Sequence, residues 1–234
     1  MADYPANGVA VLRLEEVAVR LGADWPLREV TLHLESGEAV GLVGPRGCGK
    51  TALLDAVSGF VRPARGRVWL AGHDVTGWPP QRLARAGVAR SFQTPEALER
   101  VTVRDAVAEA AIGRGLNARA TRDAVRRALV ITGLDAAAGQ DAASLPAAGR
   151  RLLALARVAA AAPRLALLDE PLAGLTANAA GLVVSALRHL HEIGVTLLVT
   201  AHDPASLRVV CSRAVLLRDG RIAADGRPSE IRCA

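Results

Sequence analysis

Lysine is almost absent from this chain of 234 residues. Lys50 is the only lysine among 29 basic residues, and all the others are arginine. Arginine serves wherever a diffuse positive charge is sufficient. The compact ammonium of lysine suits a site in which a point charge must lie close against an anion in a confined space. The one position that keeps a lysine is therefore the first candidate for a specific binding role.

Aromatic residues, cysteines and long apolar runs are also scarce. Aromatic side chains make up 3% of the chain, which argues against nucleic-acid binding by base stacking, so we expect no nucleic-acid partner. Cys48, Cys211 and Cys233 have neither disulfide nor metal-site spacing, which favours a reducing compartment. No run of ~18 uncharged apolar residues and no signal-peptide pattern is present, so the chain is not expected to span a membrane.

The composition is that of a folded globular protein. The chain is 51% hydrophobic and 22% charged, and its length suffices for one large domain or two small ones. The formal net charge is +6, but the arginines are scattered along the sequence. A solvated basic surface is the simpler interpretation, and a face directed toward a membrane or a nucleic acid is the alternative.

The lysine lies in a glycine-rich stretch between a predicted buried strand, residues 39–43, and a predicted helix, residues 52–57. The stretch fits the pattern G-x-x-x-x-G-K-T and consists of Gly44, Pro45, Arg46, Gly47, Cys48, Gly49, Lys50 and Thr51. Glycines let backbone N–H groups surround an anion, and the helix N-terminus adds positive potential. The pattern predicts a phosphate-binding loop in which Lys50 reaches the β- and γ-phosphates of ATP and the Thr51 hydroxyl binds Mg²⁺.

Alternating strand and helix patterns place this loop in a mixed α/β fold. The apolar alternation in residues 30–34 and the turn at Ser36-Gly37 predict a hairpin with strand 39–43, and residues 68–70 predict another strand. Strand 165–168, helix 178–193 and strand 195–199 follow one another, which is typical of a parallel α/β sheet. Residues 216–223 predict a closing hairpin.

The middle of the chain is predicted to be helical. Thr102 and Asp105 form a capping-box pattern for a helix ending at Ile112, a second helix covers residues 121–132, and a third covers about residues 150–161. We therefore predict a single domain, residues 1–234. In it, residues 1–93 and 163–234 form a P-loop NTPase α/β core with an N-terminal antiparallel β subdomain, and residues 94–162 form an inserted α-helical subdomain.

Polar residues follow two of the predicted strands, where open α/β sheets bind ligands. Asp169 and Glu170 come directly after strand 165–168. Asp169 suits Mg²⁺, bound through water, and Glu170 suits a general base that polarises the attacking water. His202 follows the second strand and is expected to reach the γ-phosphate from the same edge. Gln93 leads from the sheet into the helical insert, where we expect a sensor that contacts nucleotide and metal.

Together these motifs resemble the ATP-binding-cassette (ABC) ATPases over almost the whole chain. Five motifs follow one another in that family's order and spacing: the P-loop, residues 91–93 (Q-loop), residues 168–171 (Walker B), residues 173–175 (D-loop) and His202 (switch histidine). The resemblance implies that the chain hydrolyses ATP with Mg²⁺ at the cytoplasmic face of the cell membrane. It also implies two kinds of partner, a membrane permease and a second ABC ATPase subunit.

Within the family, four stretches look like those of branched-chain amino-acid or urea importers: residues 89–95, 170–175, 220–223 and 228–231. Such subunits drive a permease that receives its solute from a binding protein, and these partners choose the substrate. Three alternatives remain: a DNA-repair or translation cassette, a P-loop kinase, and a nucleotide-binding regulator with little turnover. The kinase explains the P-loop but not Gln93, Glu170 or His202.

Several positions depart from the family's pattern. The sequence Leu145-Pro146-Ala147-Ala148-Gly149 stands where the family has its signature, L-S-G-G-Q. Pro146 removes a hydroxyl and an N–H that would bind a γ-phosphate, and the two alanines add Cβ atoms where the backbone should approach closely. Ser144 is one residue early and substitutes only in part. Because two cassettes share each ATP site in this family, a degenerate signature favours a heterodimer with a full-signature partner.

Two further departures concern the base of the nucleotide and the D-loop. Leu21 occupies the expected position of the adenine-stacking aromatic residue, and Trp25 is the candidate replacement. Thr176 stands where the D-loop usually has Asp or Asn. The residue that contacts adenine is therefore left open by the sequence.

Overall fold

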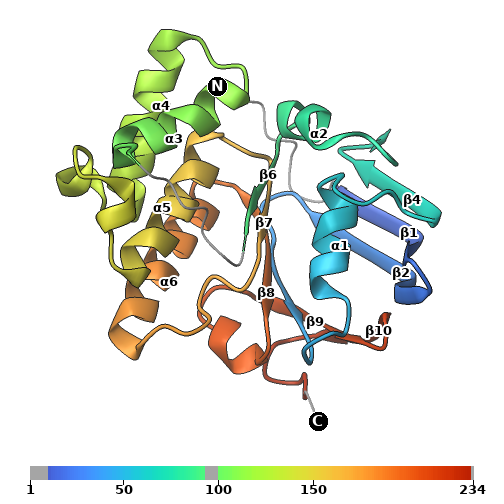
Figure 1. The fold of residues 1–234 in the computed structure, drawn as a ribbon. Helices are drawn as coiled ribbons and strands as arrows, with labels where there is room; N and C mark the ends of the chain where they lie inside the picture. The colour runs from blue at the N-terminus through green and yellow to red at the C-terminus, as the bar shows by residue number, and fades with distance from the viewer. Residues whose placement is uncertain (1–9, 93–99, 233–234) are drawn as a thin grey trace.

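A six-stranded, mostly parallel sheet forms the middle layer of the structure (Figure 1), a computed structural model that describes residues 10–92 and 100–232. The strand order is β10-β9-β3-β8-β7-β6, and only β10 runs antiparallel to its neighbour. The strands are β3 (Ala39–Val43), β6 (Val88–Ser91), β7 (Leu165–Leu168), β8 (Thr196–Ala201), β9 (Arg213–Arg218) and β10 (Arg221–Gly226). Every residue of β3, β7 and β8 is buried, because both faces of the sheet are covered.

Successive residues of these strands enter two different hydrophobic cores. Ala39 and Val43 belong to one core, whereas Val40 and Leu42 belong to the other, as the alternation of side chains in a strand requires. On the first face lie helices α3 (Val103–Gly113), α4 (Ala118–Thr132), α5 (Ala147–Ala160) and α6 (Ala177–Glu192) (Figure 1). Helix α1 (Lys50–Val57) and a second sheet cover the other face, and α2 (Pro80–Ala86) contacts β6.

The second sheet is antiparallel and has four strands in the order β2-β1-β4-β5. Its strands are β1 (Ala10–Leu21), β2 (Asp24–Glu35), β4 (Arg65–Leu70) and β5 (His73–Asp74). The predicted α/β class is confirmed: a parallel P-loop sheet, an antiparallel β part and a helical part are all present.

The predicted hairpin between residues 30–34 and 39–43 is wrong. Strand β2 pairs with β1, whereas β3 pairs with β8 and β9, so the chain crosses from one sheet to the other at residues 36–38. The N–H of Gly37 donates to Oγ1 of Thr196 at 2.9 Å and fixes this crossing to the start of β8. The alternating apolar pattern of β2 is typical of a strand with one buried face, whereas the continuously apolar β3 is buried on both faces. This difference indicates that the two strands belong to different sheets.

The predicted helices are all present, with shifted starts. Thr102 caps α3, and its hydroxyl oxygen accepts a hydrogen bond from the N–H of Asp105, as the capping pattern predicts. Helices α4 and α5 each begin three residues earlier than predicted, at Ala118 and Ala147. Strand β1 and helix α2 were not predicted. Within the described residues, no helix has the length and apolar character needed to cross a membrane.

Candidate functional site

The glycine-rich loop joins β3 to α1 and is held at its base by two other strands. The N–H of Gly220, in the turn between β9 and β10, donates to the carbonyl oxygen of Cys48, and the N–H of Arg28 in β2 donates to the carbonyl oxygen of Gly220. Cys48 is buried. The exposed tip of the loop consists of Pro45, Arg46 and Gly47. The loop is therefore fixed at its base and open at its tip, as the binding of an external anion requires.

Two glycines of the loop stand where a side chain would not fit. Gly49 has a φ of 110°, and a Cβ atom there would overlap the carbonyl oxygen of Pro26. Gly44 has a φ of 152°, and a Cβ atom there would overlap the carbonyl oxygen of Leu217. The missing side chains let the loop backbone pack directly against the carbonyl groups of β2 and β9, which fixes the conformation of the loop.

We expect Gly49→Ala to destabilise the fold more than Gly47→Ala. Gly47 also has a positive φ, 78°, but a Cβ atom there meets nothing within 4 Å. Left-handed backbone costs a non-glycine residue about 1–2 kcal/mol, so Gly47→Ala should lose about that much unfolding free energy. Gly49→Ala should lose more, because its Cβ also collides with Pro26. Urea unfolding without nucleotide measures both, and equal losses contradict the packing argument.

Lys50 is buried beneath this loop, and its ammonium binds the loop's own carbonyl groups. Its Nζ donates to the carbonyl oxygens of Gly44 at 2.7 Å and Pro45 at 3.1 Å. The same nitrogen lies 3.8 Å from Oε1 of Glu170. These charge-assisted contacts hold the positive charge of Lys50 in place beneath the loop.

Glu170 and His202 meet Lys50 at the carboxyl edge of the parallel sheet. Oε1 of Glu170, which follows β7, lies 3.0 Å from Nε2 of His202, which follows β8. Glu170 is buried and has a φ of 47°, a left-handed conformation that is costly for a residue other than glycine. Neighbouring parallel strands end at the same edge of the sheet. For this reason Lys50 and His202, far apart in the sequence, both contact Oε1 of Glu170.

Asp169 and Thr51 form a pair of oxygen donors beside this group. The hydroxyl of Thr51 donates to Oδ2 of Asp169 at 3.5 Å, and the hydroxyl of Thr200 donates to Oδ1 at 2.9 Å. Burial raises the pKa of Asp169 above its ordinary value, and the Thr200 hydrogen bond and the positive charge of Arg90 oppose that shift. A buried carboxylate next to an exposed hydroxyl is a set of hard oxygen atoms that fits Mg²⁺.

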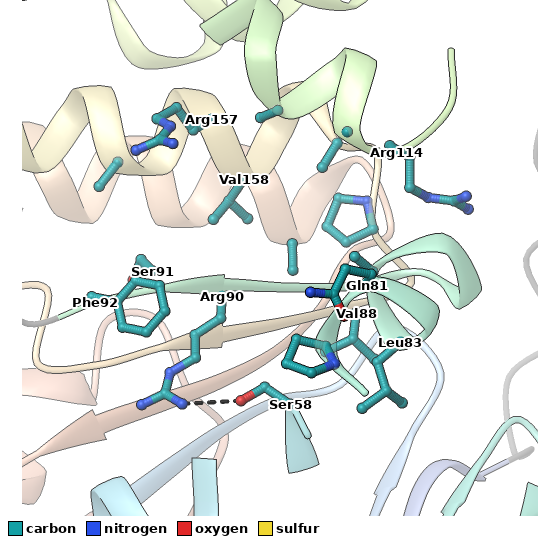
Figure 2. A pocket seen from close by; sticks show the side chains of 18 of the residues that line it. Ser58, Gln81, Leu83, Val88, Arg90, Ser91, Phe92, Arg114, Arg157 and Val158 are labelled. Carbon is teal, nitrogen blue, oxygen red and sulfur yellow. Dashed lines mark hydrogen bonds between the residues drawn. The ribbon is translucent and has the colours of Figure 1, made fainter. Parts of the chain in front are cut away.

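Arg90 connects Asp169 with helix α1. Its side chain is 6% exposed and donates to Oδ1 of Asp55 at 2.5 Å. It also donates to Oγ of Ser58 at 3.0 Å, the bond drawn in Figure 2. The guanidinium also lies 3.8 Å from Oδ2 of Asp169 and 4.8 Å from the ring centroid of Phe92. Sequence reasoning missed Arg90, because no strand was predicted at residues 88–91.

The structure thus brings together the residues predicted around the phosphates: Lys50, Thr51, Asp169, Glu170 and His202. Gln93 lies outside the described residues. Trp25 is half-buried, and the guanidinium groups of Arg20 and Arg65 each lie 5.8 Å from its ring centroid. Leu21 is 49% exposed at the end of β1.

A family model described as "ABC transporter" matches residues 27–173 of this chain. The match includes the glycine-rich loop, both carboxylates after β7 and the helices between them. The chain belongs to the ABC transporter family. It is the ATP-binding subunit type of that family, and the ABC cassettes to which it is similar are ATPases.

Relatives of this ABC ATPase serve different transport systems. A probable ABC transporter ATP-binding protein of Azorhizobium caulinodans is 32% identical over 97% of this chain and 81% of its own length. The lipopolysaccharide export system ATP-binding protein LptB of Acidithiobacillus ferridurans is 32% identical over 88% of this chain and 85% of its own. The sulfate/thiosulfate import ATP-binding protein CysA of Gloeobacter violaceus is 33% identical over 93% of this chain and 63% of its own.

Solved structures of ABC cassettes have the same fold. An ATP-binding cassette of an ABC transporter in its ADP conformation superposes with a TM-score of 0.82 at 25% identity, covering 93% of this chain and 91% of that chain. Another structure of such a cassette has a TM-score of 0.86 at 24% identity, covering 94% and 93%.

A groove of about 750 Å³ separates the helices of the insert from β6 and α2 (Figure 2). Apolar side chains such as Leu83, Leu153 and Val158 line much of it, and no residue of the glycine-rich loop does. Among the described residues, its charged lining consists of arginines without any Asp or Glu: Arg85, Arg90, Arg114, Arg150 and Arg157. The ABC ATPase therefore has an apolar, positively charged groove away from the glycine-rich loop, and Arg90 of its lining also contacts Asp169.

Proposed function

We propose that this ABC ATPase powers an importer of branched-chain amino acids, urea or related small solutes at the cytoplasmic face of the cell membrane. The observation that carries ATP hydrolysis is the meeting of Lys50, Glu170 and His202 beside Thr51 and Asp169. Import is supported by the sequence stretches that resemble such importers and by a relative named as an import protein, CysA. LptB, named as part of an export system, is the alternative that an experiment has to exclude.

Each residue of the site has a task in this reaction. The ammonium of Lys50 leaves the loop carbonyls and binds the β- and γ-phosphates of ATP. Glu170 accepts a proton from the attacking water, while His202 holds the same carboxylate oxygen and faces the γ-phosphate. The hydroxyl of Thr51 and the carboxylate of Asp169 would hold Mg²⁺, which would supply positive charge to the phosphate oxygens.

The groove is the surface that we assign to the permease. A permease reaches this subunit through a segment at the membrane surface, and an apolar groove of this volume accommodates the apolar face of a helix. Because the described lining carries arginines and no acids, we expect the docked segment to contain Asp or Glu. Arg90 lines the groove and also contacts Asp169, which gives docking a direct path to the ATP site.

Reversing a charge in the groove should weaken the complex with the permease. Arg114 lines the groove from the end of α3, and we expect Arg114→Glu to reduce co-purification with the permease by ~10-fold or more, because like charges would then face each other. Arg127→Glu on the exposed face of α4, outside the groove, is the matched control. Equal yields of permease with both variants contradict the assignment of the groove.

Purification of the tagged chain from detergent-solubilised membranes tests the proposed function. We expect a membrane permease and a second ABC ATPase subunit in the purified complex. In vesicles, ATP hydrolysis should rise when the solute-binding protein is supplied together with leucine or urea. Movement of a lipid out of the inner leaflet, without uptake of a solute, supports an export system instead.

A second candidate function is a regulatory or non-transport ABC ATPase with low turnover. It is favoured by the start of α5, where Pro146 occupies the N-cap position without a side-chain hydrogen bond. The hydroxyl of Ser144 donates to the carbonyl oxygen of Asp141, so it is already engaged. This candidate predicts that the purified chain binds ATP tightly, turns it over slowly and has no membrane partner.

A further inference from the structure

Thr200 is a fully buried threonine in contact with both carboxylate residues of the ATP site. Its hydroxyl donates to Oδ1 of Asp169 at 2.9 Å and accepts from the N–H of Glu170 at 2.8 Å. The register of the sheet explains this position. Leu168 at the end of β7 lies opposite Val199 in β8, so Asp169, which follows β7, comes beside Thr200, the next residue of β8.

We propose that Thr200 is a positioning residue for ATP hydrolysis, which sets the direction of the Asp169 carboxylate and the backbone of Glu170 with one hydroxyl group. Its hydrogen bond occupies Oδ1 of Asp169 and leaves Oδ2 toward Thr51, where the proposed Mg²⁺ site lies. The inference rests on that proposed site. Hydrogen-bond partners of a metal ligand orient the ligand, and their loss typically costs ~10–100-fold in metal affinity or activity.

The second hydrogen bond acts on the general base. Glu170 has a left-handed backbone with a φ of 47°, and its N–H has the Thr200 hydroxyl as its partner. Such a conformation persists only where the surroundings determine it. The hydroxyl therefore helps to hold the backbone in the conformation that directs the Glu170 side chain toward His202 and Lys50.

Thr196 provides a matched control on the same strand. It is also fully buried, and its hydroxyl oxygen accepts a hydrogen bond from the N–H of Gly37 at 2.9 Å. It lies at the opposite end of β8, about 13 Å from Thr200 at ~3.3 Å per residue. Thr196→Val and Thr200→Val therefore remove equivalent buried hydroxyls and keep the β-branched shape, but only the second change touches the ATP site.

The test measures the affinity for a non-hydrolysable ATP analogue by equilibrium titration, once with Mg²⁺ and once with EDTA. For Thr200→Val we expect the affinity in EDTA to be unchanged. The factor by which Mg²⁺ increases the affinity should fall by ~10-fold or more, and kcat should fall by ~10–100-fold. Thr200→Ser keeps the hydroxyl and should recover most of both losses. Thr196→Val should keep the wild-type values, although its melting temperature should also fall because a buried hydrogen bond is lost.

Equal Mg²⁺ gain and kcat in Thr200→Val and Thr196→Val would overturn the proposal. If Thr200→Val does not fold, Thr200→Ala and Thr196→Ala form the replacement pair and decide in the same way. Absence of any Mg²⁺ gain in the wild type would contradict the proposed metal site instead, and the comparison of kcat between the two variants would then decide the role of Thr200.

Discussion

Glu170→Gln is expected to abolish ATP turnover and to leave ATP binding intact. Glutamine keeps the shape of the side chain and can still accept a hydrogen bond from His202, whose Nε2 lies 3.0 Å from Oε1. It cannot take a proton from water, and the loss of a general base costs ~10²–10⁴-fold in rate.

Lys50→Ala should instead lose ATP binding, because the only lysine of the chain is removed from beneath the phosphate loop.

Equilibrium titration with ATP and a phosphate-release assay separate these two effects. Glu38→Gln is the matched control, since Glu38 is a partly buried glutamate that binds Arg213 away from the ATP site, and its activity should equal that of the wild type. Similar ATP affinity in Lys50→Ala and the wild type would contradict the role of Lys50. Rapid turnover by Glu170→Gln would show that another group activates the water.

The parts of the site that could be predicted are those whose signal is local in the sequence. The glycine-rich loop is recognised from eight consecutive residues, and Asp169, Glu170 and His202 from apolar strands that end in polar residues. Their convergence follows from one rule, that parallel strands present their carboxyl ends at the same edge of a sheet. No three-dimensional information beyond strand direction was needed to bring them together.

Thr200 and Arg90 could not be assigned because their roles depend on strand register. Thr200 meets Asp169 only because β7 and β8 pair with Leu168 opposite Val199, and the sequence does not contain that offset. The wrong hairpin has the same origin, since the apolar pattern of β2 shows that one face is buried but not which strand pairs with it. The alternation of apolar and polar residues predicts which face of a strand is buried. Which strand it pairs with is known only from the tertiary structure.

Two cassettes of this kind are expected to form an asymmetric pair. In the family that this chain belongs to, we take each ATP site to combine the P-loop of one subunit with the signature of the other. This chain has Lys50, Asp169 and Glu170 for its own half-site, whereas the N-cap residue of its α5 is Pro146, which makes no side-chain capping hydrogen bond. A homodimer would therefore have two impaired sites. A heterodimer with a full-signature partner would have one competent site, built on the P-loop of this chain.

Glu170→Gln in this chain should then remove most of the ATPase activity of the heterodimer, whereas the equivalent Glu→Gln change in the partner should leave most of it. The site closed by Pro146 lacks a donor near the transferred phosphate, and such a loss costs ~10²–10³-fold in rate by analogy with oxyanion sites. Phosphate release by the two purified mutant complexes measures the difference. Pro146→Ser should raise activity only if that second site limits turnover. Brisk ATP hydrolysis by a purified homodimer of this chain would refute the asymmetry, because both of its sites would contain the residue Pro146.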